Sequence, residues 1–338
     1  MNHAATRRRP SLIPLPAVRR VLVIRLNRMG DMICTIPILR ALRTHLPKAH
    51  LAVLCDPRGV LIAHASGAVD TVKVVKKGLN RWHSRIRNRS AVAGFDLVIG
   101  VKGRFDRLLA DVVRSSGAPY RIGFASSTEK GDFYTHPITL RDATGREHQI
   151  ETGLRLLQPL GFTADPLNFR FDPSTEAKRF ARAVAEKHHF ASHPWACLIN
   201  LTCHRGLCWP LPEYAELIRL LTTRLNAKVG LSFLPADAAA QRKLVAAVGS
   251  DKLFSLSCPT PLHLAAVLQR VRFLLTPDGG AAHLAAAMGT PALVLWPSVA
   301  IQKKRQSRSS HHHHLALGNL PMLRAVNLFD IVREKFGA

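Results

Sequence analysis

Short apolar runs alternate with amphipathic segments along most of the chain. An uninterrupted apolar run bounded by turn residues is typical of a strand buried on both faces, and a 3.6-residue period is typical of a helix packed on a sheet. In the first half, this pattern predicts strands at Val21–Leu26, Leu51–Cys55, Thr71–Val75 and Leu97–Val101. It predicts helices there at Pro37–Leu46, Arg58–Ala65 and Phe105–Ser115.

The same alternation restarts after the polar, turn-rich stretch Gly131–Arg146, with a helical period over Gln149–Leu160. The later strands are expected at Ala196–Leu201, Ala227–Phe233, Leu253–Leu256, Phe273–Thr276 and Ala292–Trp296. The later helices are expected near Pro212–Leu225, Ala236–Val248, Pro261–Gln269 and Ala281–Met288. Strands that alternate with helices predict an α/β fold with parallel sheets covered on both faces.

Two doubly wound domains in tandem are therefore expected. We predict a basic extension over residues 1–18, a first domain over 19–165 and a second over 166–338, whose last helix either stays there or returns to the first domain. Length supports this division, because 338 residues are enough for two domains that each bury a core. In such folds ligands bind at the carboxyl ends of the strands, here most simply in a cleft between the domains.

Composition narrows the class of protein further. Hydrophobic residues make up 47% and charged residues 21%, which excludes a mainly disordered chain. The 6 cysteines lack the dense spacing of a secreted disulfide framework, and the proline-broken N-terminus does not read as a signal peptide, so a cytoplasmic protein is favoured. The uncharged segment 279–302 is long enough to cross a bilayer, but Gly289, Pro291 and Pro297 interrupt it, and we expect it in a globular core.

The net charge of +26 predicts an anionic partner: nucleic acid, acidic lipid or a phosphorylated substrate. Between Val72 and Phe95 there is no acidic residue, and basic residues surround Trp82: Lys73, Lys76, Lys77, Arg81, Arg85, Arg87 and Arg89. A single Trp is no stacking platform and no nucleic-acid-binding signature is present, which disfavours nucleic acid. An anionic membrane surface or acceptor fits better, with a basic loop of no specific partner as the alternative.

Several common motifs are missing from the sequence. No G-x-G-x-x-G follows a predicted strand, and there is no P-loop, H-E-x-x-H, paired C-x-x-C or D-x-D. A dinucleotide-dependent oxidoreductase, a P-loop ATPase and an obvious catalytic metal site are therefore disfavoured. His311–His314 are possible metal ligands, but their basic and polar neighbours favour a solvated loop.

Three segments that follow predicted strands carry candidate chemistry. In the first, Gly30 permits a tight turn and Asp31 stands just ahead of the helix that Pro37 helps begin, as a candidate base or as a helix cap. In the second, Asp278 is followed by Gly279, Gly280 and, in the first turn of a small-residue helix, His283. Glycines and a helix N-terminus suit a diphosphate, and the alternative is an Asp cap before a closely packed Ala helix.

The third segment runs from Asn200 to Pro210. Thr202 offers a hydroxyl and Arg205 a forked guanidinium, both suited to phosphate oxygens. The alternative is a solvated loop beside a packed Trp209.

In this order and spacing, the three segments resemble the ADP-heptose:lipopolysaccharide heptosyltransferase family of inverting glycosyltransferases, over about residues 20–335. The strings that carry the resemblance are Val21-Leu22-Val23-Ile24-Arg25-Leu26-x-x-Met29-Gly30-Asp31, Ile36-Pro37-x-Leu39-Arg40-Ala41-Leu42-Arg43, Tyr120-Arg121-Ile122-Gly123-Phe124, Trp209-Pro210 and Asp278-Gly279-Gly280-x-x-His283-Leu284-Ala285-Ala286-Ala287-x-Gly289-Thr290-Pro291. The resemblance implies the GT-B fold, two Rossmann-like domains facing across a cleft, with acceptor bound by the first and nucleotide sugar by the second, and no metal or other cofactor.

The resemblance also implies roles for particular residues. Asp31 matches the catalytic base, and the donor-binding residues would be Thr202, Arg205, Asp278, Gly279, Gly280 and His283. Lys102, Arg81 and Arg85 are the candidate acceptor-binding residues. The chain departs from the family pattern at Leu207, where a Lys is usual, at Cys208, at Lys102-Gly103, where Gln-Gly is common, and at Gly279, where a Ser or Thr is usual.

The expected function is transfer of a heptose from a nucleotide sugar, ADP-heptose first, to the lipopolysaccharide inner core. The partners would be that donor, a phosphorylated glycolipid acceptor and an anionic membrane surface, with the enzyme cytoplasmic and peripheral to the membrane. The alternatives are a family member that uses another sugar or glycan acceptor, and a non-catalytic nucleotide- or nucleic-acid-binding protein.

Overall fold

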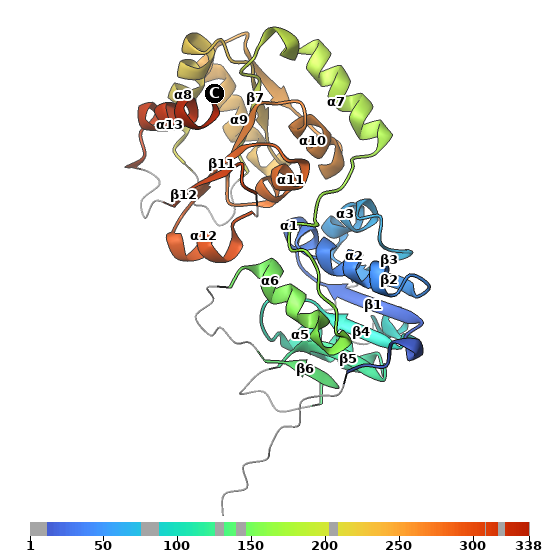
Figure 1. The fold of residues 1–338 in the computed structure, drawn as a ribbon. Helices are drawn as coiled ribbons and strands as arrows, with labels where there is room; N and C mark the ends of the chain where they lie inside the picture. Colours follow the sequence, from blue (N-terminus) through green and yellow to red (C-terminus); the bar gives the residue numbers. More distant parts are fainter. Residues whose placement is uncertain are drawn as a thin grey trace, which may run out of the picture. The chain divides into compact units, whose positions relative to one another are not determined.

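The computed structural model describes residues 12–75, 88–125, 132–139, 147–202, 209–307, 309–316 and 322–337. The chain divides into two compact units, Met1–Phe169 and Arg170–Ala338, and the division lies close to the boundary predicted after residue 165. Each unit contains a six-stranded sheet of parallel strands with helices packed beside it (Figure 1). The α/β class and the tandem arrangement predicted from the pattern are confirmed.

The sheet of the first unit has the order β3-β2-β1-β4-β5-β6. Its strands are β1 (Arg20–Arg25), β2 (His50–Cys55), β3 (Thr71–Val74), β4 (Leu97–Gly100), β5 (Tyr120–Phe124) and β6 (His136–Ile138). Its helices and 3-10 turns are η1 (Leu15–Ala17), α1 (Met29–Ile33), α2 (Ile36–His45), η2 (Pro57–Gly59), α3 (Val60–Ala65), α5 (Arg107–Ser115), α6 (Gln149–Leu154) and η3 (Arg155–Leu160). The strand order reverses direction between β1 and β4, which makes their carboxyl ends the expected ligand-binding edge.

The continuity of the apolar run explains why the sequence predicts β1 and not β5. Val21–Ile24 of β1 are at most 1% exposed and form part of the core, so β1 is a continuous apolar run. By contrast β5 holds Arg121, which donates to the carbonyls of Phe133 (3.1 Å) and Ala118 (2.6 Å), and Gly123, which breaks the apolar run. A Cβ at Gly123 would lie 2.2 Å from Cε1 of Tyr134, so the backbone approaches that ring too closely for any side chain.

The sheet of the second unit has the order β12-β11-β10-β7-β8-β9. Its strands are β7 (Cys197–Asn200), β8 (Val229–Ser232), β9 (Leu253–Leu256), β10 (Phe273–Pro277), β11 (Ala292–Trp296) and β12 (His312–Ala316). Its helices and turns are α7 (Thr175–Lys187), η4 (Phe190–Ser192), α8 (Leu211–Arg224), η5 (Pro235–Asp237), α9 (Ala238–Val248), α10 (Pro261–Leu268), α11 (Gly280–Met288), α12 (Val299–Arg305) and α13 (Ala325–Phe336). Here the order reverses between β7 and β10.

The last helix, α13, packs on α8 and places Leu328, Phe329 and Val332 in the core of the second unit. Of the two positions considered for it, the structure therefore supports the one in the second unit. The uncharged segment 279–302 forms α11, β11 and the beginning of α12. In the part of the chain that the structure describes, no helix is long and apolar enough to cross a membrane.

The solvated loop predicted for His311–His314 is wrong for three of its residues. His312, His313 and His314 belong to β12, which pairs in parallel with β11. His312 is buried, with Nδ1 2.5 Å from the Ser307 hydroxyl and Nε2 3.1 Å from the Thr290 carbonyl. A neutral imidazole satisfies both contacts, and burial lowers the pKa of His312 to about 3 and that of His314 to about 4. A run of histidines can therefore form an edge strand with one buried, uncharged imidazole.

Candidate functional site

A partly buried ion pair lies at the carboxyl edge of the first sheet, where the strand order reverses. Arg25 ends β1, and its Nη2 lies 2.7 Å from Oδ1 of Asp31 in α1. Its Nη1 donates to the carbonyl of Val101, directly after β4, at 2.8 Å. The side chains of Arg25 and Asp31 are 7% and 16% exposed. Arg25 thus connects the ends of the two strands that flank the reversal and fixes the Asp31 carboxylate at the edge where open α/β sheets bind ligands.

The position of Asp31 within α1 bears on its interpretation as a helix cap. Arg28 precedes α1 and Thr35 precedes α2, so neither helix begins at Asp31. The Thr35 hydroxyl donates to the backbone carbonyl of Asp31 at 2.8 Å, which joins the two short helices. Asp31 is the third residue of α1 rather than the residue ahead of the helix that contains Pro37.

Lys102 follows β4 at the same edge of the sheet. Its ammonium pairs with the Asp106 carboxylate, which also accepts from the Leu109 N–H at 2.9 Å at the start of α5. Burial opposes ionisation of Asp106, but the hydrogen bonds from Lys102 and Leu109 lower its pKa on balance. Lys102 therefore lies where an acceptor-binding residue is expected, but with its charge already paired. The other two candidates for acceptor binding, Arg81 and Arg85, lie outside the described residues.

In the second unit the candidate donor residues also flank the strand reversal. Asn200 ends β7 and donates to the Thr276 hydroxyl of β10 at 3.1 Å and to the Thr202 carbonyl at 3.2 Å. This bridge brings together the beginnings of the two candidate loops, at Thr202 and at Asp278. Each of the two loops follows the end of its strand, and the two strands are neighbours in the sheet. The loops therefore lie close together at one edge of the sheet.

The glycine-rich turn leads directly into α11. Gly279 has an extended backbone (φ 172°, ψ −174°), and α11 begins at Gly280. Asp278 and His283 are partly exposed, and the Asp278 N–H is bonded to the Leu295 carbonyl at 3.0 Å. The turn therefore places small residues at the N-terminus of a helix, as a phosphate-binding turn requires.

The Thr202 hydroxyl has a partner that the sequence did not indicate. It donates to Oδ2 of Asp237 at 2.8 Å and accepts from the Leu234 N–H at 3.1 Å. Asp237 lies after β8, one strand beyond β7. A threonine that donates to a carboxylate must redirect its proton to bind a phosphate, so Asp237 controls what Thr202 offers. Arg205 lies outside the described residues.

Trp209 lies near the end of the third segment and is a packing residue. It is 2% exposed, its Nε1–H donates to the Leu323 carbonyl at 2.8 Å, and its ring meets Tyr214 edge-on at 4.8 Å between centroids. Pro210 directly precedes α8. The alternative interpretation of this segment, a loop beside a packed Trp, is therefore correct for Trp209 itself.

These residues supply two kinds of chemistry. The first unit holds a carboxylate able to accept a proton, and the second holds a glycine-rich turn and a hydroxyl able to contact phosphate oxygens. Within the described residues, no group of three or more His, Cys, Asp or Glu is placed to hold a metal ion.

Comparison with known proteins identifies related chains. Residues 85–324, more than half of the chain, match the profile of the family described as "Glycosyltransferase family 9 (heptosyltransferase)". Lipopolysaccharide heptosyltransferase 1 of Salmonella typhimurium strain LT2 is 23% identical over 292 residues, which cover 82% of this chain and 88% of the relative.

Solved structures share the fold. A glycosyl transferase family 9 protein from Veillonella parvula DSM 2008 superposes with a TM-score of 0.79 at 18% identity, over 94% of this chain and 97% of its own. The E. coli heptosyltransferase WaaC, solved with ADP, gives a TM-score of 0.68 at 22% identity over 94% and 99%. WaaC with ADP-2-deoxy-2-fluoro heptose gives 0.70 at 20% identity over 93% and 99%. The GT-B class with two Rossmann-like domains, expected from the sequence, is confirmed.

Proposed function

This chain belongs to glycosyltransferase family 9 (heptosyltransferase), and from that premise we propose that it transfers a heptose from ADP-heptose to the lipopolysaccharide inner core. The observation that carries the proposal is the Asp31 carboxylate, held by Arg25 at the strand reversal of the first sheet. Two related structures support the donor, because WaaC has been solved with ADP and with ADP-2-deoxy-2-fluoro heptose.

In the proposed reaction the acceptor hydroxyl is bound by the first unit, next to Asp31. Its oxygen attacks the anomeric carbon of the donor, and its proton passes to the Asp31 carboxylate. The bond from the anomeric carbon to the diphosphate breaks, and the electron pair leaves with the diphosphate. Attack on the side opposite the leaving group inverts the anomeric configuration.

The second unit would bind the nucleotide diphosphate. Backbone N–H groups at Gly279 and Gly280 and the Thr202 hydroxyl would stabilise the negative charge on the leaving group, with Asp278 and His283 beside them. Arg205 would add a cation there. With these donors in place, departure of the diphosphate would need no metal or other cofactor.

The acceptor would be a phosphorylated glycolipid, with Lys102, Arg81 and Arg85 among its binding residues. The net charge of +26 supports a cytoplasmic enzyme that associates with the inner face of the membrane, because anionic surfaces attract such chains. A family member that uses another sugar remains the second candidate, favoured by Gly279 in place of the usual hydroxyl residue.

Transfer assays with a panel of nucleotide sugars test the reaction, with Asp31→Asn as the informative variant. Asn keeps the size of the side chain but cannot accept the proton, so we expect transfer to fall at least about a hundredfold, the lower range of general-base catalysis. Melting temperature and ADP affinity should stay near wild type. Full transfer by a folded Asp31→Asn protein would contradict the role of Asp31, and preference for another sugar nucleotide would select the second candidate.

A further inference from the structure

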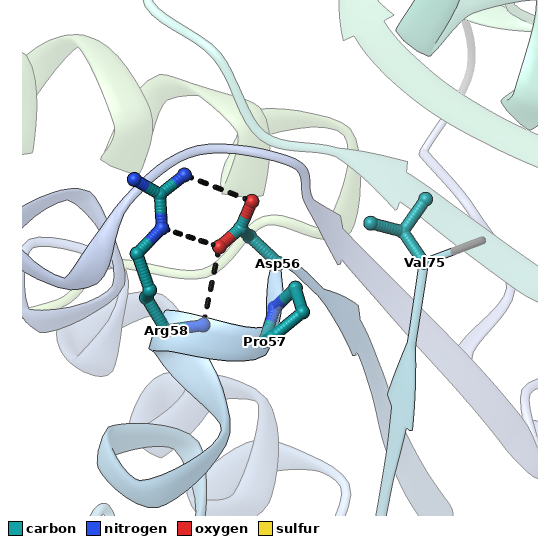
Figure 2. Close-up of a pocket in the computed structure, with 4 residues that line it drawn as sticks. All are labelled: Asp56, Pro57, Arg58 and Val75. Atoms are coloured by element: carbon teal, nitrogen blue, oxygen red, sulfur yellow. Dashed lines mark hydrogen bonds and ion pairs between the residues drawn. The ribbon is translucent and has the colours of Figure 1, made fainter. Parts of the chain in front are cut away.

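A second Asp–Arg pair lies at the same edge of the first sheet, outside the residues assigned above. Asp56 and Arg58 directly follow β2, the neighbour of β1. With Pro57 and Val75 they line a hollow of about 420 Å³ (Figure 2). A hollow of this volume falls in the range that binds small molecules or parts of larger ones.

The two charged groups of this pair differ in their exposure to solvent. Oδ1 of Asp56 accepts from the Arg58 backbone N–H at 3.1 Å and from Nε at 2.8 Å, and Oδ2 accepts from Nη2 at 3.1 Å. The Asp56 side chain is 3% exposed, whereas that of Arg58 is 56% exposed. The carboxylate is therefore behind the guanidinium, and the fork leaves the two N–H groups of Nη1 outside the contact (Figure 2).

The contact with Asp56 prepares Arg58 to bind a ligand. A free Arg side chain loses conformational entropy when it binds, and the bidentate contact with Asp56 has already restricted it. The hydrogen bonds that Arg58 donates to the Asp56 carboxylate raise the pKa of Arg58, so the guanidinium stays charged. The contact with the backbone N–H caps η2 and accounts for the position of the Asp56 carboxylate. The ion pair with the half-exposed guanidinium adds little to the stability of the fold beyond this cap.

Arg58 is also next to the helix that carries the candidate base. The turn η2, which contains Arg58, packs against α1, which contains Asp31. The packing is close, because a Cβ at Gly59 would lie 3.4 Å from Cβ of Met32. Arg58 thus lies at the same edge of the sheet as Asp31, on a turn that contacts the helix of the candidate base.

We propose that Arg58, fixed by Asp56, binds an anionic group of the acceptor, a phosphate or a carboxylate, and thereby orients the acceptor beside Asp31. Both groups present a pair of oxygens to the N–H donors of a guanidinium. The inference rests on the proposed function in that it takes the glycolipid acceptor to be bound by the first unit.

Arg58→Met in the full-length chain tests the proposal, with Arg43→Met as a matched control. Arg43 also forms an ion pair in the first unit, with Asp70 at 2.5 Å, but that pair lies at the amino ends of β2 and β3. The probe is heptose-deficient lipopolysaccharide, whose binding is measured directly and whose KM is measured in the transfer assay. We expect Arg58→Met to weaken binding and raise this KM about tenfold or more, the loss of a charge-assisted hydrogen bond.

Arg43→Met should leave both values near wild type, and neither variant should change ADP affinity. Arg58→Lys, which keeps the charge but loses the fork, should fall between Arg58→Met and wild type. Removing the phosphates of the probe with a phosphatase distinguishes the two ligands: the difference between wild type and Arg58→Met disappears for a phosphate and persists for a carboxylate.

Equal binding of the glycolipid by Arg58→Met and Arg43→Met would overturn the proposal. Because binding is read without turnover, failure of the proposed reaction is a separate outcome. A wild-type protein that transfers no heptose, while its Arg58→Met variant still loses glycolipid binding, would refute the reaction and retain the subsite.

Discussion

Arg25 shows how one residue can serve a reaction through another. Its side chain is buried. The two Nη atoms contact Val101 and Asp31, whereas Nε has no hydrogen-bond partner. A buried ion pair often contributes no more stability than apolar residues of the same volume. The positioning of the Asp31 carboxylate is a better explanation for an Arg at the end of an otherwise apolar strand.

A double-mutant cycle tests this positioning role. Arg25→Met should lower kcat at least about tenfold in the wild-type background, because a misplaced base loses much of its contribution of about 10²–10⁴. In the Asp31→Asn background the same change should have almost no further effect on transfer, since there is no base to position. Arg25→Lys should recover part of the activity. Equal losses in the two backgrounds would instead indicate a role that does not pass through Asp31.

Gly279 is the second residue whose substitution is informative. Its extended φ of 172° is open to any residue, and the nearest atom to a Cβ there would be the Pro277 carbonyl oxygen at 3.9 Å. Space therefore does not explain why this chain lacks the hydroxyl residue usual at this position.

We expect Gly279→Ser to fold with an unchanged melting temperature and to bind ADP several-fold more tightly, because one added hydrogen bond contributes about 1 kcal/mol. Gly279→Ala, which adds the β-carbon without the hydroxyl, is the control and should bind as wild type. Calorimetric titration with ADP measures both. Identical affinities for the Ser and Ala variants would mean that the turn does not contact the diphosphate.

At the scale of elements, the continuity of apolar and β-branched residues decided which strands the sequence could predict. The central strands and the edge strands β3 and β9 have such runs and were predicted. The edge strands β6 and β12 lack an apolar run, and β5 is interrupted by Arg121 and Gly123. The candidate loops were also predictable, since the segments that contain Asp31, Thr202 and Asp278 each follow the end of a strand. Their partners were not: Arg25 reads as part of a strand, and Asp237 meets Thr202 only because β7 and β8 are neighbours.

The histidines of strand β12 are expected to lower the stability of the protein in acid. His312 has a folded pKa of about 3, below its ordinary value of 6.5, so between these values the unfolded chain binds more protons than the folded chain. The free energy of unfolding should therefore fall as the pH is lowered from about 6.5, by up to about 1.4 kcal/mol for each pH unit per such group.

His312→Asn removes the titrating group, so it should make this pH dependence shallower. Urea unfolding at pH 5, 6 and 7 measures the slope, and His311→Asn, at an exposed neighbour outside the strand, is the control. If the slopes of wild type and His312→Asn agree, His312 is not buried as a neutral group.

At the scale of the whole molecule, the dominant feature is the excess of positive charge. The +26 is spread over both units, but the acid-free stretch between Val72 and Phe95 concentrates it. Lys73 belongs to the part of this stretch that the structure describes. Its charge is only partly available to a membrane, because its ammonium donates to the Ala91 carbonyl at 2.9 Å and lies over the Phe95 ring. Membrane attraction from this stretch must come from its other basic residues.

The arginines of this stretch are expected to carry most of its attraction to a membrane. Changing Arg81, Arg85, Arg87 and Arg89 together to Ser should weaken binding to vesicles rich in anionic lipid by at least about tenfold, because each basic residue near such a surface contributes about 1 kcal/mol. The remaining binding should depend less on salt, since exposed charges are screened within about 8 Å at physiological ionic strength. ADP affinity should not change.

The control removes the same charge elsewhere, from four exposed residues of the second unit: Arg179, Arg182, Arg242 and Lys243. If net charge alone drives attraction, the two quadruple variants will bind vesicles equally weakly. If the stretch is a membrane- or acceptor-facing surface, only its own variant will lose binding, because attraction falls off within a Debye length and depends on which face approaches the lipid. Sedimentation with vesicles at low and physiological salt separates these outcomes, and unchanged binding by both variants would remove the proposed membrane association.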